Sequence, residues 1–295
     1  MFETFSRSWE ITKLSFNVIQ KDKELLLFPL LAGIFSIIFI LVMLFPSIIT
    51  SFMEGRGPGS YGITEYLIFF ITYLGLAFIA TFFNVCVVYT TKIRFEGGNA
   101  TFSESIKFAR SKIGLIITWS IIVATVGLIL RIIDNMAERA GESGRIVLNI
   151  LTSILGMMWS IITIFVVPAM VYNDLRPMDA IKKSVQTLKK TWGESLIRYF
   201  GLGTIEFLFL FLGVIVAFVL LFVLAGLGLA GIIITIAIAV LYFLGVILVF
   251  SVANTVFNTA LYVYADTGKI PEGYSKEIMQ NAFKSGGNIR PPADI

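Results

Sequence analysis

The chain has 295 residues, of which 57% are hydrophobic and only 14% are charged, with 23 lysines and arginines against 19 aspartates and glutamates. Soluble domains are about 45–50% apolar and about 25% charged, so these charges are too few to cover a water-facing surface. The chain has no histidine and one cysteine, Cys86, which excludes histidine-based catalysis, an intramolecular disulfide and the common His- or Cys-ligated metal sites. We therefore expect an all-α, polytopic membrane protein that is no enzyme, needs no cofactor and binds no nucleic acid.

The first 24 residues predict an amphipathic helix that precedes the first membrane span. Phe5, Trp9, Thr12 and Phe16 follow one another at steps of four, three and four residues, and the positions between them are largely polar. The apolar run after this segment is too long for a cleaved signal peptide, and no small-residue cleavage site follows it. We expect the helix to lie in the membrane interface.

Six apolar stretches are long enough to cross a membrane, which takes about 20 residues. They lie at roughly 25–52, 62–91, 114–133, 146–172, 199–225 and 230–264. Pro168 in the fourth stretch predicts a helix break of the kind that is tolerated inside a bundle. Only the glycine-rich segment 225–231 separates the last two stretches, which predicts a tight reversal there.

The distribution of lysine and arginine decides between six and seven spans, because residues 199–264 could hold either two or three. With six spans and an inner N-terminus, 19 of these basic residues lie in inner segments and 4 in outer segments. A seventh span would move the C-terminal tail outside and change the split to 15 and 8. Since lysine and arginine favour the inner side, we expect six spans in the cell membrane with both termini cytoplasmic.

Two later linkers, 92–112 and 173–198, resemble the first 24 residues and also lead into odd-numbered spans. Each has apolar residues at the same steps of four, three and four: Phe102, Ile106, Ala109 and Ile113; Ile181, Val185, Leu188 and Trp192. Spans two and six both close with a Phe-Asn pair. The alternative explanation is that any hairpin protein places basic amphipathic linkers inside the cell.

The repeated pattern predicts a bundle of three quasi-repeated units, each made of an interfacial amphipathic helix and a transmembrane hairpin. We expect one membrane domain over residues 1–265, with units at about 1–91, 92–172 and 173–265, followed by a cytoplasmic tail at 266–295. The glycines and prolines of the tail predict flexibility outside one short helix at 275–284.

The polar faces of the three amphipathic helices carry many cations, which suits the anionic inner leaflet. The expected headgroup contacts are Lys13, Lys107, Arg110, Lys182, Lys183, Lys189 and Lys190. We therefore expect anionic membrane lipids as partners, with a second copy of the chain or another membrane protein as a further partner.

Polar residues inside the spans are the candidate site. Glu206 is the only acid well inside a span, and its position eight residues after Arg198 places it about 12 Å deep. Asn84, Asn254 and Asn258 fall in the same inner half of the membrane. One hypothesis is a polar pocket that binds a cation, a proton or a lipid headgroup. The other is that the amides form interhelical hydrogen bonds while Glu206 is protonated or reaches the interface.

Two residue types inside the spans are expected to serve packing. Trp119 and Trp159 lie within spans rather than at their ends, so we expect them to pack between helices. Small residues allow close approach of helices in a membrane. The glycines expected to mark such contacts are Gly75, Gly127, Gly156, Gly201, Gly203, Gly213 and Gly245.

Two segments carry a resemblance to known families. The start, Ser8-Trp9-Glu10 and then Lys21-Asp22-Lys23-Glu24-Leu25-Leu26-Leu27-Phe28-Pro29-Leu30, resembles a prokaryotic family of uncharacterised multipass membrane proteins. The segment Val171-Tyr172-Asn173 followed by Arg176-Pro177-Met178-Asp179-Ala180-Ile181-Lys182-Lys183-Ser184 is similar to a motif in the membrane domain attached to some glycerophosphodiester phosphodiesterases. The resemblance implies a shared six-helix scaffold. The chain has no counterpart of the soluble phosphodiesterase domain, so the resemblance does not imply that activity.

These observations favour a non-enzymatic integral membrane protein with a lipid-interacting or scaffolding role. The alternative is a transporter or channel for a small solute or ion that uses the inner-leaflet pocket around Glu206, since repeats and mid-membrane polar groups mark many carriers. The shared orientation of the three units and the lack of a matching polar path in the outer half favour the first function.

Overall fold

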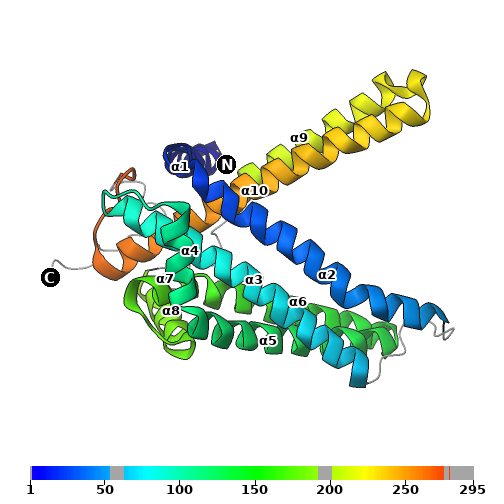
Figure 1. The fold of residues 1–295 in the computed structure, drawn as a ribbon, viewed down its shortest axis with the longest axis horizontal. Coiled ribbons are helices and arrows are strands. Elements are labelled where there is room, and N and C mark those ends of the chain that lie inside the picture. Colours follow the sequence, from blue (N-terminus) through cyan, green and yellow to red (C-terminus); the bar gives the residue numbers. More distant parts are fainter. Residues whose placement is uncertain (1, 54–62, 192–200, 276–278, 280–295) are drawn as a thin grey trace. The chain divides into compact units, whose positions relative to one another are not determined.

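The computed structural model describes residues 2–53, 63–191, 201–275 and 279, and every regular element in these residues is a helix. The helices are α1 (Phe2–Lys21), η1 (Lys23–Leu26), α2 (Leu27–Met53), α3 (Ile63–Phe95), α4 (Phe102–Ser111), α5 (Ile113–Arg139), α6 (Glu142–Thr163), α7 (Val166–Asn173), α8 (Pro177–Thr191), α9 (Gly201–Val223), η3 (Ala225–Leu227) and α10 (Leu229–Thr267). Figure 1 shows them in chain order.

Six helical segments within the described residues are long and apolar enough to cross a membrane. They are Lys23–Met43, Tyr66–Phe95, Ile113–Arg139, Glu142–Asn173, Ile205–Val223 and Leu229–Thr267. Many large apolar side chains on them point outward, such as Phe222 and Leu241, which are 71% and 72% exposed. A continuous apolar surface of this kind requires lipid rather than water around it. The chain is therefore an integral membrane protein, and the predicted all-α, six-span architecture is confirmed.

Two compact units emerge from the contacts between helices. The first contains α1, α9 and α10 together with Thr91–Asn99, and the second contains Phe28–Thr90 and Ala100–Thr187. Along the chain, a shorter helix precedes two longer segments three times in the described residues: α1 before α2 and α3, α4 before α5 and α6–α7, and α8 before α9 and α10. The three-fold repeat and its boundaries stay predictions.

The fourth span is broken, as Pro168 predicts, and the break lies at Ile164 and Phe165, between α6 and α7. Proline has no backbone N–H, and its ring clashes with the carbonyl four residues earlier, which is that of Ile164. The break removes the Ile162 carbonyl and the Phe165 N–H from the regular helical pattern. The buried Ser184 side chain on α8 satisfies both, since its hydroxyl donates to the Ile162 carbonyl and accepts from the Phe165 N–H at 3.3 Å.

Replacing Ser184 by alanine is expected to lower the free energy of unfolding by about 1–3 kcal/mol, because it leaves buried backbone groups without a partner. The unfolding free energy of the purified protein in detergent measures this loss. Ser153→Ala is the matched control, since the exposed Ser153 hydroxyl donates only to the Asn149 carbonyl of its own helix at 2.8 Å. An equal loss in both variants would contradict the role of Ser184 in the break.

The reversal between α9 and α10 follows the prediction from the glycine-rich segment 225–231 (Figure 1). Gly228 has φ 57° and ψ −133°, a conformation that side chains disfavour. At Gly231, a Cβ atom would lie 2.0 Å from the Leu224 carbonyl oxygen, so only glycine fits. Further along the hairpin, the Tyr242 hydroxyl donates to the Phe209 carbonyl at 2.8 Å.

The predicted packing residues have mixed outcomes. Trp119 and Trp159 stack with their ring centroids 5.9 Å apart, which confirms their role between α5 and α6. A Cβ atom on Gly75 or Gly213 would clash with the ring of Phe39 or Tyr242, so these glycines do mark close contacts. The prediction is wrong for three others, where an added Cβ atom would meet no described residue within 4 Å: Gly156, Gly203 and Gly245.

Helix α1 packs against α9 and α10 with a face that coincides only in part with the predicted stripe. Trp9 is 51% exposed, whereas Ile11, Ser15 and Val18 are buried. The reason is that α1 has apolar side chains on more than one side, and its partner helices select the side that becomes buried. Of the stripe positions, Thr12 is buried, and the ring of Phe16 lies edge-on to that of Phe250 on α10 at a centroid distance of 5.5 Å.

The first residues of the tail are packed, contrary to the expected flexibility. Tyr274 is only 8% exposed, and a 3.1 Å hydrogen bond joins its hydroxyl to that of Ser15. Its ring lies edge-on to Phe95 and tilted against Phe257, at centroid distances of 6.0 Å and 6.3 Å. The helix predicted at 275–284 falls mostly on residues outside the described part of the chain.

Candidate functional site

The four polar residues predicted to share a pocket are distributed over both units. Glu206 on α9 and Asn254 and Asn258 on α10 lie in the first unit, whereas Asn84 on α3 lies in the second. Each of the four side chains is half-buried. The Oδ1 atom of Asn84 is buried and has no hydrogen-bond partner among the described residues. The pocket around Glu206 stays a prediction.

The cations predicted to meet lipid headgroups lie mostly on the surface. Five of them are exposed: Lys13, Lys107, Arg110, Lys182 and Lys189. Lys183 is half-buried, and the side chain of Lys190 lies outside the described residues. On α4 the opposite face is buried, with Ser105 and Ala109 at 0% exposure, and Ser105 makes a 2.7 Å hydrogen bond with Thr90 of α3. This arrangement leaves the Lys107 ammonium and the Arg110 guanidinium of α4 free to reach an interface.

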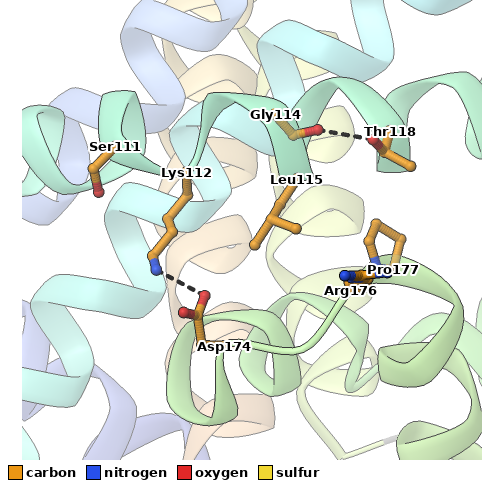
Figure 2. Close-up of a pocket in the computed structure, with 8 residues that line it drawn as sticks. All are labelled: Ser111, Lys112, Gly114, Leu115, Thr118, Asp174, Arg176 and Pro177. Carbon is orange, nitrogen blue, oxygen red and sulfur yellow. Dashed lines mark hydrogen bonds and ion pairs between the residues drawn. The ribbon is translucent and has the colours of Figure 1, made fainter.

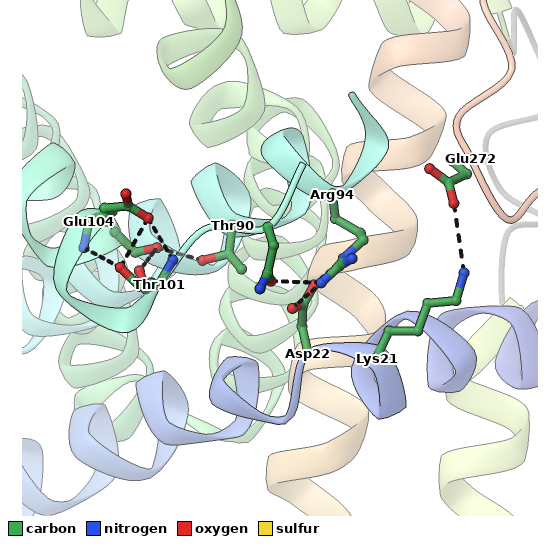
Figure 3. A network of polar contacts seen from close by, with 9 residues as sticks. Lys21, Asp22, Thr90, Arg94, Thr101, Glu104 and Glu272 are labelled. Atoms are coloured by element: carbon green, nitrogen blue, oxygen red, sulfur yellow. Dashed lines mark hydrogen bonds and ion pairs between the residues drawn. The ribbon is translucent and has the colours of Figure 1, made fainter. Parts of the chain in front are cut away.

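Helix α4 begins with a hydrogen-bonded cap. The Thr101 backbone N–H donates to the Glu104 carboxylate at 2.7 Å, and the Glu104 N–H donates to the Thr101 hydroxyl at 3.3 Å (Figure 3). These two bonds satisfy backbone groups that a helix start leaves unpaired. The hydrogen bonds from Thr101 lower the pKa of the Glu104 carboxyl, so the cap is intact at neutral pH and weakens in acid.

An ion pair joins the start of the first hairpin to its end. The Arg94 guanidinium at the end of α3 donates to both carboxylate oxygens of Asp22, which directly precedes η1 and α2 (Figure 3). The Nη2 atom of Arg94 also donates to the side-chain oxygen of Asn99 at 2.8 Å. Asp22 is 7% exposed and Arg94 21% exposed, so this pair is largely shielded from solvent.

A second ion pair, of reversed polarity, joins the start of the second hairpin to its end. Lys112, between α4 and α5, lies 2.7 Å from the carboxylate of Asp174, which follows α7 (Figure 2). Asp174 has φ 51°, in the left-handed region that ends many helices. Each of the first two hairpins is thus closed at its open end, opposite the connecting loop, by a carboxylate and a cation.

A pocket of about 440 Å³ opens beside the second pair. Figure 2 shows Lys112 and Asp174 on one side of it, Leu115 and Thr118 along α5, and Arg176 and Pro177 at the start of α8. Ser111 and Gly114 complete the lining. The Arg176 side chain is exposed and has no ion-pair partner among the described residues. We call this cavity the α5–α8 pocket.

The composition of the α5–α8 pocket suits an anionic or zwitterionic small group. Two cations, Lys112 and Arg176, accompany one carboxylate, Asp174. Guanidinium and ammonium groups bind phosphate through charge-assisted hydrogen bonds. No group of three or more His, Cys, Asp and Glu side chains that could hold a metal ion occurs in the described residues.

Sequence reasoning missed the α5–α8 pocket, because its charged residues lie at helix junctions. Lys112 counts there as a topology signal, and Asp174 is 62 residues away from it. A usable signal was present in the segment Asn173-Asp174-Leu175-Arg176-Pro177, where opposite charges flank a turn and proline starts a helix. Because the pairing depends on closure of the hairpin, spacing alone does not reveal it.

Comparison with known proteins supplies the family but no chemistry. No curated protein matches the chain. The similarity to the membrane domain attached to some glycerophosphodiester phosphodiesterases therefore stays a prediction. A family model matches residues 63–272, a segment that contains the α5–α8 pocket and five of the six spans in the described residues. With more than two thirds of its length matched, the chain belongs to the family of unknown function DUF6159.

Proposed function

We propose that this integral membrane protein is not an enzyme and that it binds the phosphate of membrane lipid headgroups in the α5–α8 pocket. The observation that carries the proposal is the position of two cations, Lys112 and Arg176, in a cavity at the first turns of a span. The pocket extends along α5 from Gly114 to Thr118, and each residue advances about 1.5 Å along a helix. The resulting depth of about 6 Å along the helix corresponds to the thickness of the headgroup layer on one side of a bilayer.

An apolar ridge beside the pocket supports a lipid over a soluble phosphate compound. Ile113, Ile117 and Ile121 follow one another at single-turn spacing on α5 and are 44–45% exposed. They form a ridge adjacent to Gly114 and Thr118, which line the pocket. A headgroup in the pocket would direct its acyl chains along this ridge.

The exposed lysines on α1, α4 and α8 support the same function at lower specificity. We propose that they contact anionic lipids of the cell membrane, with both termini cytoplasmic, as the split of basic residues favours. Nucleic acid is not among the proposed partners. A scaffolding role through a second copy of the chain or another membrane protein stays a prediction.

Blocking the pocket tests the proposal without a change of charge. A Cβ atom on Gly114 would meet nothing within 4 Å, so Gly114→Leu is expected to fold and to fill the pocket. Phosphatidylglycerol added to the protein in detergent is expected to stabilise the wild type, and by linkage a tenfold loss of affinity removes up to about 1.4 kcal/mol of this stabilisation. We expect a loss of that size in Gly114→Leu and in Arg176→Gln.

The matched control is Gly156→Leu, which also places a side chain in open space on a span. It is expected to keep the stabilisation by phosphatidylglycerol. If Gly114→Leu and Arg176→Gln both respond to the lipid as the wild type does, lipid binding in the α5–α8 pocket is refuted.

The second candidate is a transporter or channel that uses Glu206. The half-buried carboxylate and the unsatisfied Asn84 oxygen favour it, because polar groups inside spans are costly and often functional. A solute flux into proteoliposomes that Glu206→Gln abolishes would support this alternative over lipid binding.

A further inference from the structure

The α5–α8 pocket contains two hydroxyl groups whose protons are already engaged. The Ser111 hydroxyl donates to the Phe108 carbonyl at 2.7 Å. The Thr118 hydroxyl donates to the Gly114 carbonyl at 2.8 Å (Figure 2). A hydroxyl group has one proton and two acceptor lone pairs. Both hydroxyl oxygens can therefore accept a hydrogen bond from a molecule in the pocket but cannot donate one.

The Asp174 carboxylate is a further hydrogen-bond acceptor. One of its oxygens, Oδ1, accepts from Lys112, and the carboxylate is 65% exposed, so its other lone pairs are open to a ligand. Together with Ser111 and Thr118, Asp174 gives the pocket three acceptor groups. A phosphate cannot donate hydrogen bonds to these acceptors, because a phosphodiester carries no proton at neutral pH.

The pocket thus carries two kinds of recognition group. Lys112 and Arg176 donate hydrogen bonds and attract a negative charge, whereas Ser111, Thr118 and Asp174 accept hydrogen bonds and attract a positive charge. A ligand that satisfies both has a phosphate and, a few bonds away, a primary ammonium group. A quaternary ammonium group has no N–H and would leave the acceptors unsatisfied.

We propose that the α5–α8 pocket selects phospholipids whose headgroup carries a primary ammonium. The inference rests on the proposed function and adds the substrate class. Lys112 and Arg176 hold the lipid phosphate. The carboxylate of Asp174 and the hydroxyl oxygens of Ser111 and Thr118 accept hydrogen bonds from the ammonium.

Two pairs of lipids isolate the ammonium from surface charge. Phosphatidylethanolamine and phosphatidylcholine are both zwitterionic, and only the first has N–H donors. Phosphatidylserine and phosphatidylglycerol have the same net charge, and only the first has an amine. Lipid affinities are measured on the protein in nanodiscs of stated composition or in detergent with short-chain forms of each lipid. The wild type is expected to prefer the primary-amine lipid of each pair by about five- to tenfold, the net effect of about one hydrogen bond.

Asp174→Asn is the decisive variant. Asparagine tolerates the left-handed conformation at this position, so the α7 terminus is expected to remain folded. The variant is expected to lose the preference within both pairs while it still binds phosphatidylglycerol. Asp174→Gly, which adopts the same backbone conformation without strain, is expected to behave in the same way. The control is Asp179→Asn, which should retain the preference: Asp179 is an exposed acid whose ion-pair partner among the described residues is Lys182 of its own helix, at 3.7 Å.

The outcomes separate the two proposals. If the wild type binds both members of each pair equally, or if Asp174→Asn and Asp174→Gly keep the preference, ammonium recognition is wrong while lipid binding in the pocket stands. If Gly114→Leu and Arg176→Gln also leave every lipid affinity unchanged, both proposals fail. Glycerophosphoethanolamine, the headgroup without acyl chains, is the last arm. Binding as tight as that of the lipid would overturn the lipid as occupant, and binding at least tenfold weaker supports it.

Discussion

The Asp22→Ala variant is expected to lose about 3 kcal/mol of unfolding free energy, because it strands the Arg94 guanidinium in a largely buried position. Breaking a buried ion pair costs about 3–5 kcal/mol, and the 21% exposure of Arg94 places this pair at the lower end of that range. The measurement is equilibrium unfolding in mixed micelles, with denaturant as the variable.

The adjacent residue provides the control for this prediction. Lys21 pairs with Glu272 at 3.7 Å, but both side chains are more than half exposed. Exposed pairs contribute about 0–1 kcal/mol, so Lys21→Ala should leave stability nearly unchanged. The double variant Asp22→Ala with Arg94→Ala removes both charges and is expected to be more stable than the sum of the single losses implies. Additive losses would show that the two side chains act separately.

The position of this pair gives it a role in assembling the hairpin. Asp22 precedes α2 and Arg94 lies in the last turn of α3. Their contact therefore requires that the start of α2 and the end of α3 lie side by side. The Lys112–Asp174 pair likewise requires that the start of α5 and the end of α7 lie side by side. Apolar packing alone leaves helices in a membrane free to slide, whereas a paired charge at the open end sets their register.

The spans could be predicted because the bilayer fixes their length and polarity. A helix in hydrocarbon must satisfy its backbone internally and present apolar side chains, which makes runs of about 20 apolar residues diagnostic. The reversal at 225–231 was predictable for a local reason, since Gly228 and Gly231 occupy positions that exclude a side chain. The break near Pro168 was predictable for the same kind of reason.

The buried face of α1 was only partly predictable from periodicity. Steps of four, three and four select Trp9 and Thr12, yet Trp9 is exposed while Ile11 and Ser15 are buried. The side of a helix that becomes buried depends on the partner helices, here α9 and α10, which lie about 200 residues later in the chain. Periodicity predicts that a face exists, and tertiary contacts select which one.

The candidate site likewise has features that the sequence predicts and others that depend on tertiary contacts. Counting residues from the charged ends of the spans places Glu206 and Asn84 at a common depth, but depth carries no information on which way a side chain points around its helix. The α5–α8 pocket depends on contact between Lys112 and Asp174 across a whole hairpin. Such a site becomes visible only once the helices are paired in space.

Tyr274→Ala is expected to be the most damaging change in the tail, with a loss of about 3 kcal/mol of unfolding free energy. Its ring is buried between Phe95 and Phe257, and removal of a large aromatic side chain from such a site costs about 3–5 kcal/mol. The same denaturant experiment measures the loss. A tail that contributes little to the fold would show a change below about 0.5 kcal/mol, as is common for surface positions.

Tyr274→Phe keeps the ring and removes only the hydroxyl, so it separates packing from hydrogen bonding. The lost hydrogen bond to Ser15 should cost about 0.5–1.5 kcal/mol at neutral pH.

Burial raises the pKa of the Tyr274 hydroxyl well above its ordinary value of 10.0. The folded protein therefore holds this proton more tightly than the unfolded chain does. The contribution is complete below about pH 10 and is lost as the pH rises further, because the unfolded tyrosine ionises first. Unfolding free energies between pH 8 and about 11 should thus fall more steeply for the wild type than for Tyr274→Phe. Parallel pH profiles would show that Tyr274 is accessible to solvent in the folded protein.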